Sequence, residues 1–545
     1  MKASELAIKC LENENVAYMF GIPGEENLDL MDALLESKIQ FIQTRDERGA
    51  AFMADVYGRL TGKAGVCLAT LGPGAMNLVT GVADANMDRA PLVAITGQAG
   101  LDRMHKESHQ YMDVVSVFKP MTKWNTLLHV PEIIPESIRK AFKVATAEKP
   151  GATHIDFPED LAKMQTAGEP VPHDFPSDAE PVDACLERAA QLIREARQPI
   201  ILAGNGVVRQ GASQVLTEFA EAANIPVAHT FMGKGSIPWT HPLSLLTVGL
   251  QARDFVSCGF DRADLVIAIG YDIVEYHPRL WNLGQDKKIV HIDTEPSESD
   301  AAYVTDVEMV GNIKHSLACL LAQGIQPKEL AYASDTLREI ILARITEHRD
   351  DKAFPMKPQK ILSDIRSVLA ENDILISDVG AHKMWIARMY PCYQPNTCII
   401  SNGFAAMGIA VPGAFVAKLI YPERNCLAVC GDGGFLMNSQ ELETAVRVGV
   451  PFVTLIFNDE AYGLIEWKQM NTFGRPAHID FTNPDFVKYA QAFGAKGYRV
   501  QGSDELVPIL KDAFNQNVPS VIDCPVNYAE NLRLTEELGN LTCPI

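Results

Sequence analysis

Two aspartates in the last third of the chain each follow a run of apolar residues. Asp432 lies in Gly431-Asp432-Gly433-Gly434, directly after one such run, and Asp459 follows a second run 27 residues later. Because the carboxyl ends of parallel strands meet at one edge of a sheet, both carboxylates can converge on one hard cation such as Mg²⁺. The glycines leave bare backbone that a diphosphate can approach closely. Each segment alone is typical of an ordinary β-turn, but the pair favours a magnesium and diphosphate site.

Alternating apolar runs and helix-length segments would position such residues. Apolar runs occur at 66–69 and 92–95 near the start of the chain, at 199–203 and 265–269 in the middle, and at 427–430 in the last third. Short apolar runs separated by helix-length segments are typical of buried parallel strands in α/β proteins. The sequence therefore predicts an α/β fold.

Two polar segments divide the alternation into three domains of similar length. The segment 166–184 is rich in proline and acidic residues and cannot support a core element, and 346–357 is polar and charged. We predict linkers at both places. The predicted domains are residues 1–165, 185–345 and 358–545.

The segments around the two aspartates resemble a known cofactor motif. Gly431-Asp432-Gly433 followed by Asn458-Asp459 is similar to the thiamine diphosphate motif, and Glu47 in Arg45-Asp46-Glu47-Arg48 matches the glutamate of that family. Ile22-Pro23-Gly24 and Leu71-Gly72-Pro73-Gly74 match two of its loops. Within the family the chain resembles acetolactate synthases, and Gly270 to Pro278 with Trp281-Asn282 is similar to the catabolic, FAD-independent branch. The resemblance implies three doubly wound parallel-sheet domains, which are pyrimidine-binding, central and diphosphate-binding in chain order.

The resemblance also implies roles for individual residues. Glu47 would hydrogen-bond the pyrimidine N1′ of the cofactor, and its neutral form would be favoured in an apolar pocket. Met407 would support the folded cofactor, and the carbonyl of Ala405 would accept from the 4′-amino group. The implied metal ligands are Asp432, Asp459 and the carbonyl of Ala461. The implied cofactor-binding residues are Pro23, Gly24, Gly72, Ala381, His382, Ala405, Met407, Gly431, Gly433, Gly434 and Tyr462.

The implied substrate is a 2-oxo acid. His109 and Gln110 resemble the position where a glutamine of this family faces the reacting acid, and a neutral amide can orient a carboxylate without overstabilising it. The implied reaction decarboxylates pyruvate on thiamine diphosphate and condenses the hydroxyethyl enamine with a second pyruvate, giving 2-acetolactate and carbon dioxide. An apolar lid would exclude protons and so prevent release of acetaldehyde.

Several alternatives stay open from the sequence. The chain could be a thiamine-dependent decarboxylase, lyase or carboligase for another 2-oxo acid or aldehyde, or an inactive scaffold that keeps the fold. Trp467 and the acids Glu159-Asp160 depart from the biosynthetic branch, so a preference for 2-oxobutyrate is not implied. Glyoxylate carboligase is disfavoured because the family implies that this enzyme lacks the glutamate at Glu47. The segment 204–211 could pass for a dinucleotide loop, although it fails the GxGxxG spacing.

Composition restricts the possible partners. The 545 residues carry 48 lysines and arginines against 69 aspartates and glutamates, a net charge of −21, so binding to nucleic acid or to anionic membranes is not expected. We find neither a signal peptide nor an apolar run of transmembrane length, and we expect a cytoplasmic protein. The eleven cysteines form no CxxC pair and are expected to be mainly buried thiols. The resemblance further implies Mg²⁺ and thiamine diphosphate as cofactors, no FAD, and a homodimer or homotetramer with active sites between chains.

Overall fold

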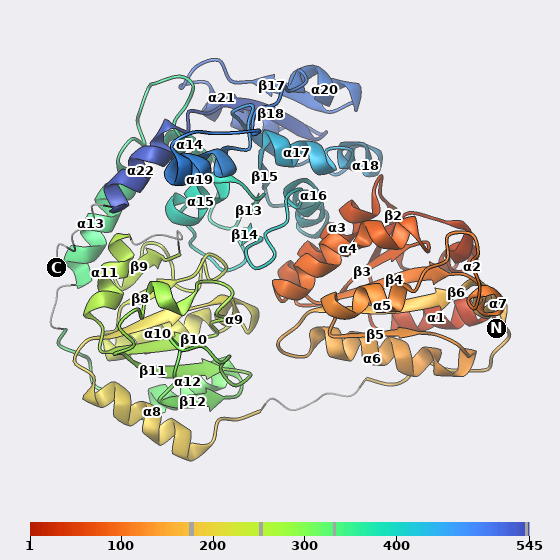
Figure 1. Ribbon diagram of the computed structural model, residues 1–545, viewed down its shortest axis with the longest axis horizontal. Coiled ribbons are helices and arrows are strands. Elements are labelled where there is room, and N and C mark those ends of the chain that lie inside the picture. Colours follow the sequence, from red (N-terminus) through yellow and green to blue (C-terminus); the bar gives the residue numbers. More distant parts are fainter. Residues whose placement is uncertain (174–178, 250–253, 331–333, 540–542, 544–545) are drawn as a thin grey trace.

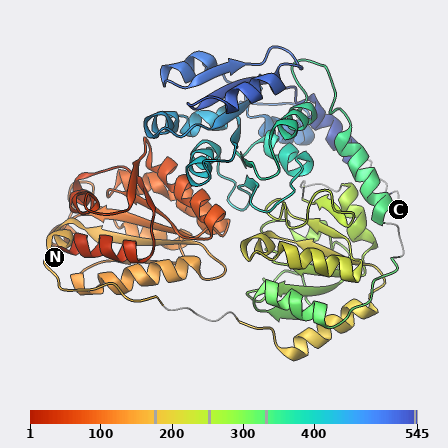
Figure 2. The ribbon, with the colours of Figure 1, turned by 180° about the vertical axis from the view of Figure 1, so that it is seen from behind.

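The computed structural model describes residues 1–173, 179–249, 254–330, 334–539 and 543. These residues form three six-stranded sheets, each with helices on both faces (Figures 1 and 2). Neighbouring strands within each sheet run parallel, as in the pairs β1 with β3, β7 with β10 and β15 with β16. The predicted class, α/β with three doubly wound parallel sheets, is confirmed.

The first sheet has the strand order β2-β1-β3-β4-β6-β5. Its strands are β1 (Tyr18–Gly21), β2 (Gln40–Gln43), β3 (Gly65–Ala69), β4 (Leu92–Gln98), β5 (Trp124–Leu127) and β6 (Ala152–Pro158). The accompanying helices are α1 (Ala3–Asn13), α2 (Leu28–Leu34), α3 (Glu47–Thr61), α4 (Pro73–Met87), α5 (Val114–Phe118), α6 (Ile134–Thr146) and α7 (Glu159–Lys163).

The second sheet has the order β12-β11-β10-β7-β8-β9. Its strands are β7 (Pro199–Ala203), β8 (Val227–His229), β9 (Ser244–Thr247), β10 (Leu265–Ile269), β11 (Lys288–Asp293) and β12 (Val307–Val310). The helices are α8 (Asp183–Glu195), α9 (Asn205–Arg209), α10 (Ser213–Ala223), α11 (Phe255–Arg262), α12 (Ile313–Ala322) and α13 (Ser334–Thr346).

The third sheet has the order β14-β13-β15-β16-β18-β17. Its strands are β13 (Ile374–Ser377), β14 (Cys398–Ile400), β15 (Cys426–Gly431), β16 (Val453–Asn458), β17 (Lys496–Arg499) and β18 (Ser520–Pro525). The helices are α14 (Pro358–Val368), α15 (Ala381–Met389), α16 (Ala410–Ile420), α17 (Asp432–Asn438), α18 (Glu441–Val448), α19 (Gly463–Phe473), α20 (Phe486–Ala492), α21 (Leu506–Phe514) and α22 (Ala529–Gly539).

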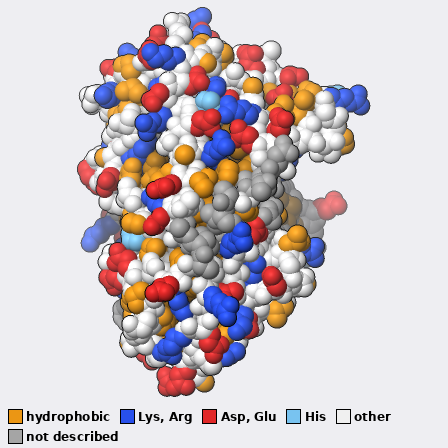
Figure 3. All heavy atoms as spheres, turned by 90° about the vertical axis from the view of Figure 1, so that its left-hand side faces the viewer, with side chains coloured by type: hydrophobic (Ala, Val, Ile, Leu, Met, Phe, Trp, Pro, Cys, Tyr) orange, Lys and Arg blue, Asp and Glu red, His pale blue; other side chains and the backbone are white. Residues whose placement is uncertain are grey.

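Each sheet falls within one of the three domains expected from the sequence, but the exact boundaries stay predictions. Part of the expected linker 166–184 and the far end of the last domain lie outside the described residues. No helix among the described residues is long and apolar enough to cross a membrane. On the face that carries α11, α13 and α22, acidic and basic side chains are interspersed (Figure 3).

Small residues let α3 pack closely against α4 of the same domain and against α16 of the third domain. A β-carbon on Gly81 of α4 would lie 2.5 Å from the Ala51 side chain of α3, and one on Gly413 of α16 would lie 3.0 Å from the Val56 side chain of α3. Such distances leave no room for a larger residue. One apolar core cluster accordingly contains residues of α3, α4 and α16, so it spans both domains.

The cysteines agree with the sequence prediction except for one pair. Seven free cysteines are buried, among them Cys426 and Cys430 of β15. Cys258 and Cys543, however, form a disulfide across 285 residues of sequence. The expectation of thiols is wrong for this pair, because only the folded arrangement brings two such distant residues together.

Candidate functional site

A cavity of about 160 Å³ opens at the carboxyl edge of the third sheet. The loops that follow β13, β15, β16 and β18 supply part of its wall, as expected for a doubly wound sheet. It is lined by eleven residues expected from the sequence: Ala381, His382, Ala405, Met407, Gly431, Asp432, Gly433, Gly434, Asp459, Ala461 and Tyr462. Six further residues line it: Gly380, which precedes Ala381, and five to which the sequence did not point, Val379, Gly463, Leu464, Ile465 and Tyr528. Tyr528 follows β18, so the edge argument used for the two aspartates could have found it.

The two aspartates form an incompletely satisfied acidic site in this cavity. Asp432 Oδ1 accepts from the Gly433 N–H at 2.9 Å, and Oδ2 accepts from the Glu460 N–H at 2.7 Å and from Asn483 Nδ2 at 2.8 Å. Asp459 Oδ2 is buried and has no hydrogen-bond partner among the described residues. Burial, followed by the charge of Asp432, raises the pKa of Asp459 to about 8. A divalent cation would offset this cost, so the donor set fits a hard metal ion.

Close packing explains the glycines of the cavity. A β-carbon on Gly433 would lie 2.9 Å from the Tyr462 ring, and one on Gly434 would lie 3.2 Å from the Asp378 carboxyl group. At Gly431 the nearest atom would be His382 Cε1, at 3.3 Å. The glycines therefore let the wall pack closely and leave its backbone free of side chains, so a diphosphate can approach the backbone.

Glu47 begins α3 in the first domain and is 9% exposed. Its Oε2 accepts from Asn77 Nδ2 at 2.9 Å, and Oε1 lies 3.2 Å from the position of a β-carbon on Gly74. Asn77 stands in the first part of α4 and was not predicted. Asp46 fixes the start of α3, since its carboxylate accepts from the Arg48 N–H at 2.8 Å. The carboxyl group of Glu47 is thus held in one orientation.

The other residues expected in the first domain occupy loops of this same domain. A β-carbon on Gly24, which follows Pro23, would lie 2.4 Å from the Thr70 side chain. Gly72 has a φ of 52°, and a β-carbon there would lie 2.6 Å from the Gln110 carbonyl oxygen. His109 and Gln110 are exposed in the loop before α5. None of these residues, nor Glu47, lines the cavity of the third domain. Within one chain the expected site residues thus form two separate groups.

Glu441 of α18 connects the third domain to the start of α3. Its Oε1 accepts from the Arg45 N–H at 3.0 Å and from the Asp46 N–H at 3.1 Å, and its Oε2 accepts from Thr444 Oγ1 at 2.6 Å. These two N–H groups lie directly before Glu47. This contact could not be predicted from the sequence, because almost 400 residues separate the two segments.

Glu441 predicts a pH dependence of stability. Burial raises the pKa of this carboxyl group to about 7, from an ordinary value of 4.5. Between these values the folded protein binds more protons than the unfolded chain, so the free energy of unfolding falls as the pH rises from about 4.5 to 7. We expect Glu441→Gln, which keeps an acceptor oxygen, to lose less melting temperature between pH 5 and pH 8 than the unchanged protein. Glu423→Gln, at an exposed position, is the control. Equal pH slopes for the Glu441→Gln and unchanged proteins would contradict the prediction.

A buried ion cluster lies where α3 and α4 approach the third domain. The Arg59 guanidinium donates to Asp55 at 2.7 Å, to Asp84 at 2.8 Å and to Asp88 at 3.0 Å, and all four side chains are at most 8% exposed. Burial and the charges of Asp88 and Asp55 raise the pKa of Asp84, against the opposing effect of Arg59. The cluster therefore depends on its single cation.

The same acids shape the segment that carries Ala405 and Met407. Asp84 accepts from Ser401 Oγ at 2.7 Å, and Asp88 accepts from the Gly403 N–H at 2.6 Å. Ala405 has a φ of 57°, a left-handed conformation that is strained for a residue with a β-carbon. Contacts from the first domain thus hold this strained backbone at the wall of the cavity.

A larger cavity, of about 330 Å³, lies where the three domains meet. It is lined by Arg59, Asp88, Glu148, Arg209 and other residues, but by none of the catalytic, cofactor or metal residues expected from the sequence. The segment 204–211 lies beside it, and the Asn205 N–H donates to the Glu275 carboxylate at 3.1 Å. The N–H group at the start of this loop is thus already hydrogen-bonded to Glu275 of the same chain.

Three segments, which together make up most of the chain, match models of thiamine pyrophosphate enzymes. Residues 1–117 match the N-terminal TPP binding domain, residues 186–320 the central domain, and residues 378–524 the C-terminal TPP binding domain. Thiamine pyrophosphate is the same compound as thiamine diphosphate. The cavity lies in the C-terminal match, and Glu47 lies in the N-terminal one.

Similar proteins match over nearly the full chain. A probable acetolactate synthase large subunit of Methanocaldococcus jannaschii is 37% identical, over 99% of this chain and 95% of its own. An acetolactate synthase of Bacillus subtilis is 34% identical, over 98% and 95% of the two chains. A catabolic acetolactate synthase of Raoultella terrigena is 34% identical, over 98% and 97%. With all three domains matched and this coverage, the chain belongs to the acetolactate synthase family of thiamine diphosphate-dependent enzymes.

Proposed function

We propose that the protein is an acetolactate synthase that joins two molecules of pyruvate to give 2-acetolactate and carbon dioxide. The observation that carries the proposal is the cavity of the third domain, where Asp432 and the unsatisfied Asp459 carboxylate lie beside a glycine-rich wall. An inactive scaffold would have no need to keep two repelling buried carboxylates in a cavity. The named relatives above support the same reaction class.

The residues of the cavity fit thiamine diphosphate with Mg²⁺. Asp432, Asp459 and the Ala461 carbonyl would hold the metal ion, and Gly433 with Gly434 would line the diphosphate. Ala405 and Met407 also line the cavity and would contact the organic part of the cofactor. When bound, the cofactor supplies the carbon nucleophile and the electron sink that decarboxylation of a 2-oxo acid requires.

Glu47, Gln110 and the apolar wall would perform the remaining tasks. The Glu47 carboxyl group, oriented by Asn77, would hold a proton at an oxygen that faces the cofactor. The Gln110 amide would orient the pyruvate carboxylate, with His109 beside it. Leu464, Ile465 and Tyr462 would exclude water, so that the two-carbon unit reacts with a second pyruvate before it is protonated.

A second copy of the chain would complete the site. Glu47 and Gln110 do not line the cavity, and the lining residues Tyr462 and Ile465 are 41% and 47% exposed in the single chain. Apolar side chains left open at a functional cavity suit a protein interface. We propose a homodimer or homotetramer in which Glu47 of one copy faces the cavity of the other.

Mixing two inactive variants tests this arrangement. Glu47→Gln and Asp432→Asn disable opposite sides of the site, so a dimer with one copy of each has one site with both changes and one with neither. We expect re-equilibrated equimolar mixtures to recover about a quarter of the original activity, since half of the dimers are mixed and each has one intact site. Mixtures of Asp432→Asn with Asp459→Asn, which share a side, serve as the control. An active monomer in light scattering would contradict the proposal.

Loss of the Asp432 carboxylate is expected to weaken metal binding. Asp432→Asn keeps the shape and the contact with the Gly433 N–H but removes one charged ligand, so the dissociation constant of Mg²⁺ should rise at least ~10-fold. Titration of Mg²⁺ in the presence of thiamine diphosphate, followed by tryptophan fluorescence of the protein, measures it. The control Asp350→Asn, at an exposed position, makes the same change in net charge. If both variants bind Mg²⁺ equally, Asp432 is not a ligand.

We further propose that the enzyme works without FAD. The Asn205 N–H, at the start of the possible dinucleotide loop, is bonded to Glu275, and burial raises the pKa of that carboxyl group to about 7. Tyr271 and Trp281 are buried beside this loop in the core of the central domain. A purified protein with flavin absorbance would overturn this proposal.

A product assay decides between the possible reactions. Purified protein would receive Mg²⁺, thiamine diphosphate and pyruvate, with and without 2-oxobutyrate, and products would be identified by NMR. Acetolactate from pyruvate alone is the expected result. A mixed product would indicate the biosynthetic substrate range, acetaldehyde would indicate a decarboxylase, and no turnover with bound cofactor would indicate another 2-oxo acid or acceptor.

A further inference from the structure

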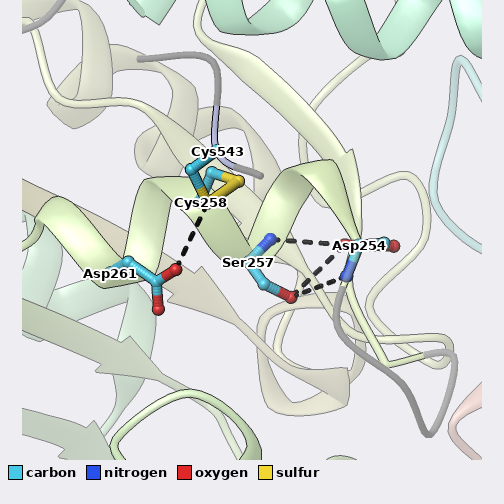
Figure 4. The surroundings of a disulfide bond; sticks show 5 residues. All are labelled: Asp254, Ser257, Cys258, Asp261 and Cys543. Atoms are coloured by element: carbon cyan, nitrogen blue, oxygen red, sulfur yellow. Dashed lines mark hydrogen bonds between the residues drawn. A yellow bond between two sulfur atoms is a disulfide. The ribbon is translucent and has the colours of Figure 1, made fainter. Parts of the chain in front are cut away.

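The disulfide between Cys258 and Cys543 connects two domains. Cys258 lies in α11 of the central domain and is fully buried, whereas Cys543 lies four residues beyond the end of α22 and is partly exposed. Their α-carbons are 5.5 Å apart. Figure 4 shows Cys543 beside α11, with the Cys258 and Asp261 side chains pointing toward it. The pair therefore joins Cys543 covalently to α11 of the central domain.

Polar side chains lie around the pair. Asp254 caps α11, since its carboxylate accepts from the Ser257 N–H at 3.2 Å, and its other oxygen lies 3.5 Å from Arg388 of α15. Asp261, one turn after Cys258, has Oδ2 3.4 Å from Cys543 Sγ. In the reduced protein the Asp261 carboxylate would accept from the Cys543 thiol at this distance. The Cys543 sulfur thus has a partner in both forms, Cys258 when oxidised and Asp261 when reduced.

Helix α22 connects the tail to the cofactor cavity. Asn531 accepts from the Trp385 indole N–H of α15 at 2.8 Å, and Thr535 accepts from the Trp467 indole N–H of α19 at 2.7 Å. Both α15 and α19 begin in the cavity wall, and Tyr528, directly before α22, also lines the cavity. Leu538, near the end of α22, is buried in the same core cluster as Cys258. The segment 528–538 is therefore connected to that wall at three places.

We propose that the Cys258–Cys543 pair is a reversible redox site, whose closed form holds α22 in place and strengthens retention of the diphosphate cofactor. Opening takes two thiol–disulfide exchanges with a small thiol. The first thiolate attacks the sulfur of Cys543, the less buried residue of the pair, the bond between the two sulfurs breaks, and Cys258 leaves as a thiolate that takes up a proton. A second thiolate attacks the mixed disulfide, which releases Cys543 as a thiol and a small-molecule disulfide. Closure is the reverse, with that disulfide as the oxidant.

Peptide mapping and melting test the site on the full-length protein. Protein is equilibrated with either glutathione disulfide or an excess of reduced glutathione, and free thiols are then blocked. We expect a linked Cys258–Cys543 peptide only in the oxidised sample. Reduction should lower the melting temperature by at least ~3 °C, because the bridge closes a long loop. Cys543→Ser should melt like the reduced protein in both conditions, and Cys319→Ser should respond like the unchanged protein.

Cofactor binding tests the link to the cavity. We expect the dissociation constant of thiamine diphosphate, measured by titration with Mg²⁺ present, to rise about 5-fold on reduction or in Cys543→Ser. Absence of the linked peptide after oxidation would overturn the pairing. A linked peptide with unchanged melting and unchanged cofactor affinity would overturn the link to α22. Cys543 is partly exposed, and its replacement leaves the buried Cys258 unchanged. The Cys543→Ser protein is therefore expected to fold, so its cofactor affinity can be measured. Peptide mapping and melting stay informative even if the proposed reaction is wrong.

Discussion

Turnover of pyruvate by a Glu47→Gln protein is expected to fall by a factor of ~10²–10⁴, the usual contribution of a positioned acid–base group. Glutamine has the same shape and can still accept from Asn77 Nδ2, which lies 2.9 Å from the Glu47 carboxylate, but it cannot give or take the proton. Glu47 is not one of the proposed metal ligands, so Mg²⁺ binding should change little. Steady-state kinetics and a Mg²⁺ titration on the same preparation separate the two effects.

The control for this change is Glu36→Gln, at an exposed position of the same domain. It removes the same charge and should leave turnover within a factor of about two, as surface changes away from a site usually do. Turnover by Glu47→Gln close to that of the unchanged protein would remove Glu47 from the mechanism. Loss of Mg²⁺ binding together with turnover would instead assign Glu47 a structural role.

Replacement of Arg59 by methionine is expected to cost about 3–5 kcal/mol of folding stability. The change leaves Asp55, Asp84 and Asp88 buried without their cation, and all three lie within 3.0 Å of the guanidinium. Asp84 and Asp88 also hold the segment that contains Ala405, so cofactor retention should fall as well. Thermal melting with and without thiamine diphosphate measures both losses.

A partly exposed ion pair at the start of the same helix supplies the control. Arg48 pairs with Asp46 at 3.1 Å, but the Arg48 side chain is 39% exposed, so Arg48→Met should cost at most about 1 kcal/mol. The deficit of Arg59→Met should also shrink in acid, because the uncompensated carboxyl groups can then be protonated. Equal losses in the two variants, or a deficit independent of pH, would contradict this account of the cluster.

The sequence was most informative where chemistry and local pattern coincide. Apolar runs ending in Asp432 and Asp459 predict parallel strands and a shared edge, and the structure places both residues in one cavity. The family of the chain also followed from these residues and Glu47. Such features depend on neighbours in the sequence and on the general topology of α/β sheets.

The partners of the site residues could not be predicted in this way. Asn77 orients Glu47, and Glu441 holds the turn before it, but neither has a distinctive local pattern. The contact of Ser401 with Asp84 and the bridge from Cys258 to Cys543 join segments more than 280 residues apart. Contacts of this kind depend on how whole domains pack. No periodic pattern of neighbouring residues in the sequence indicates that packing.

The dependence of Ala405 on acids of the first domain has a consequence for biosynthesis. A ribosome releases the amino-terminal part of a chain first, at ~5–20 residues per second, and domains generally fold as they emerge. Asp84 and Asp88 precede Ser401 by more than 300 residues, so their domain is available on the order of tens of seconds before the 401–406 segment appears. The earlier domain can therefore act as a template on which the later segment takes its left-handed turn. In a circular permutant whose third domain is synthesised before the first, this template would be absent when the 401–406 segment emerges.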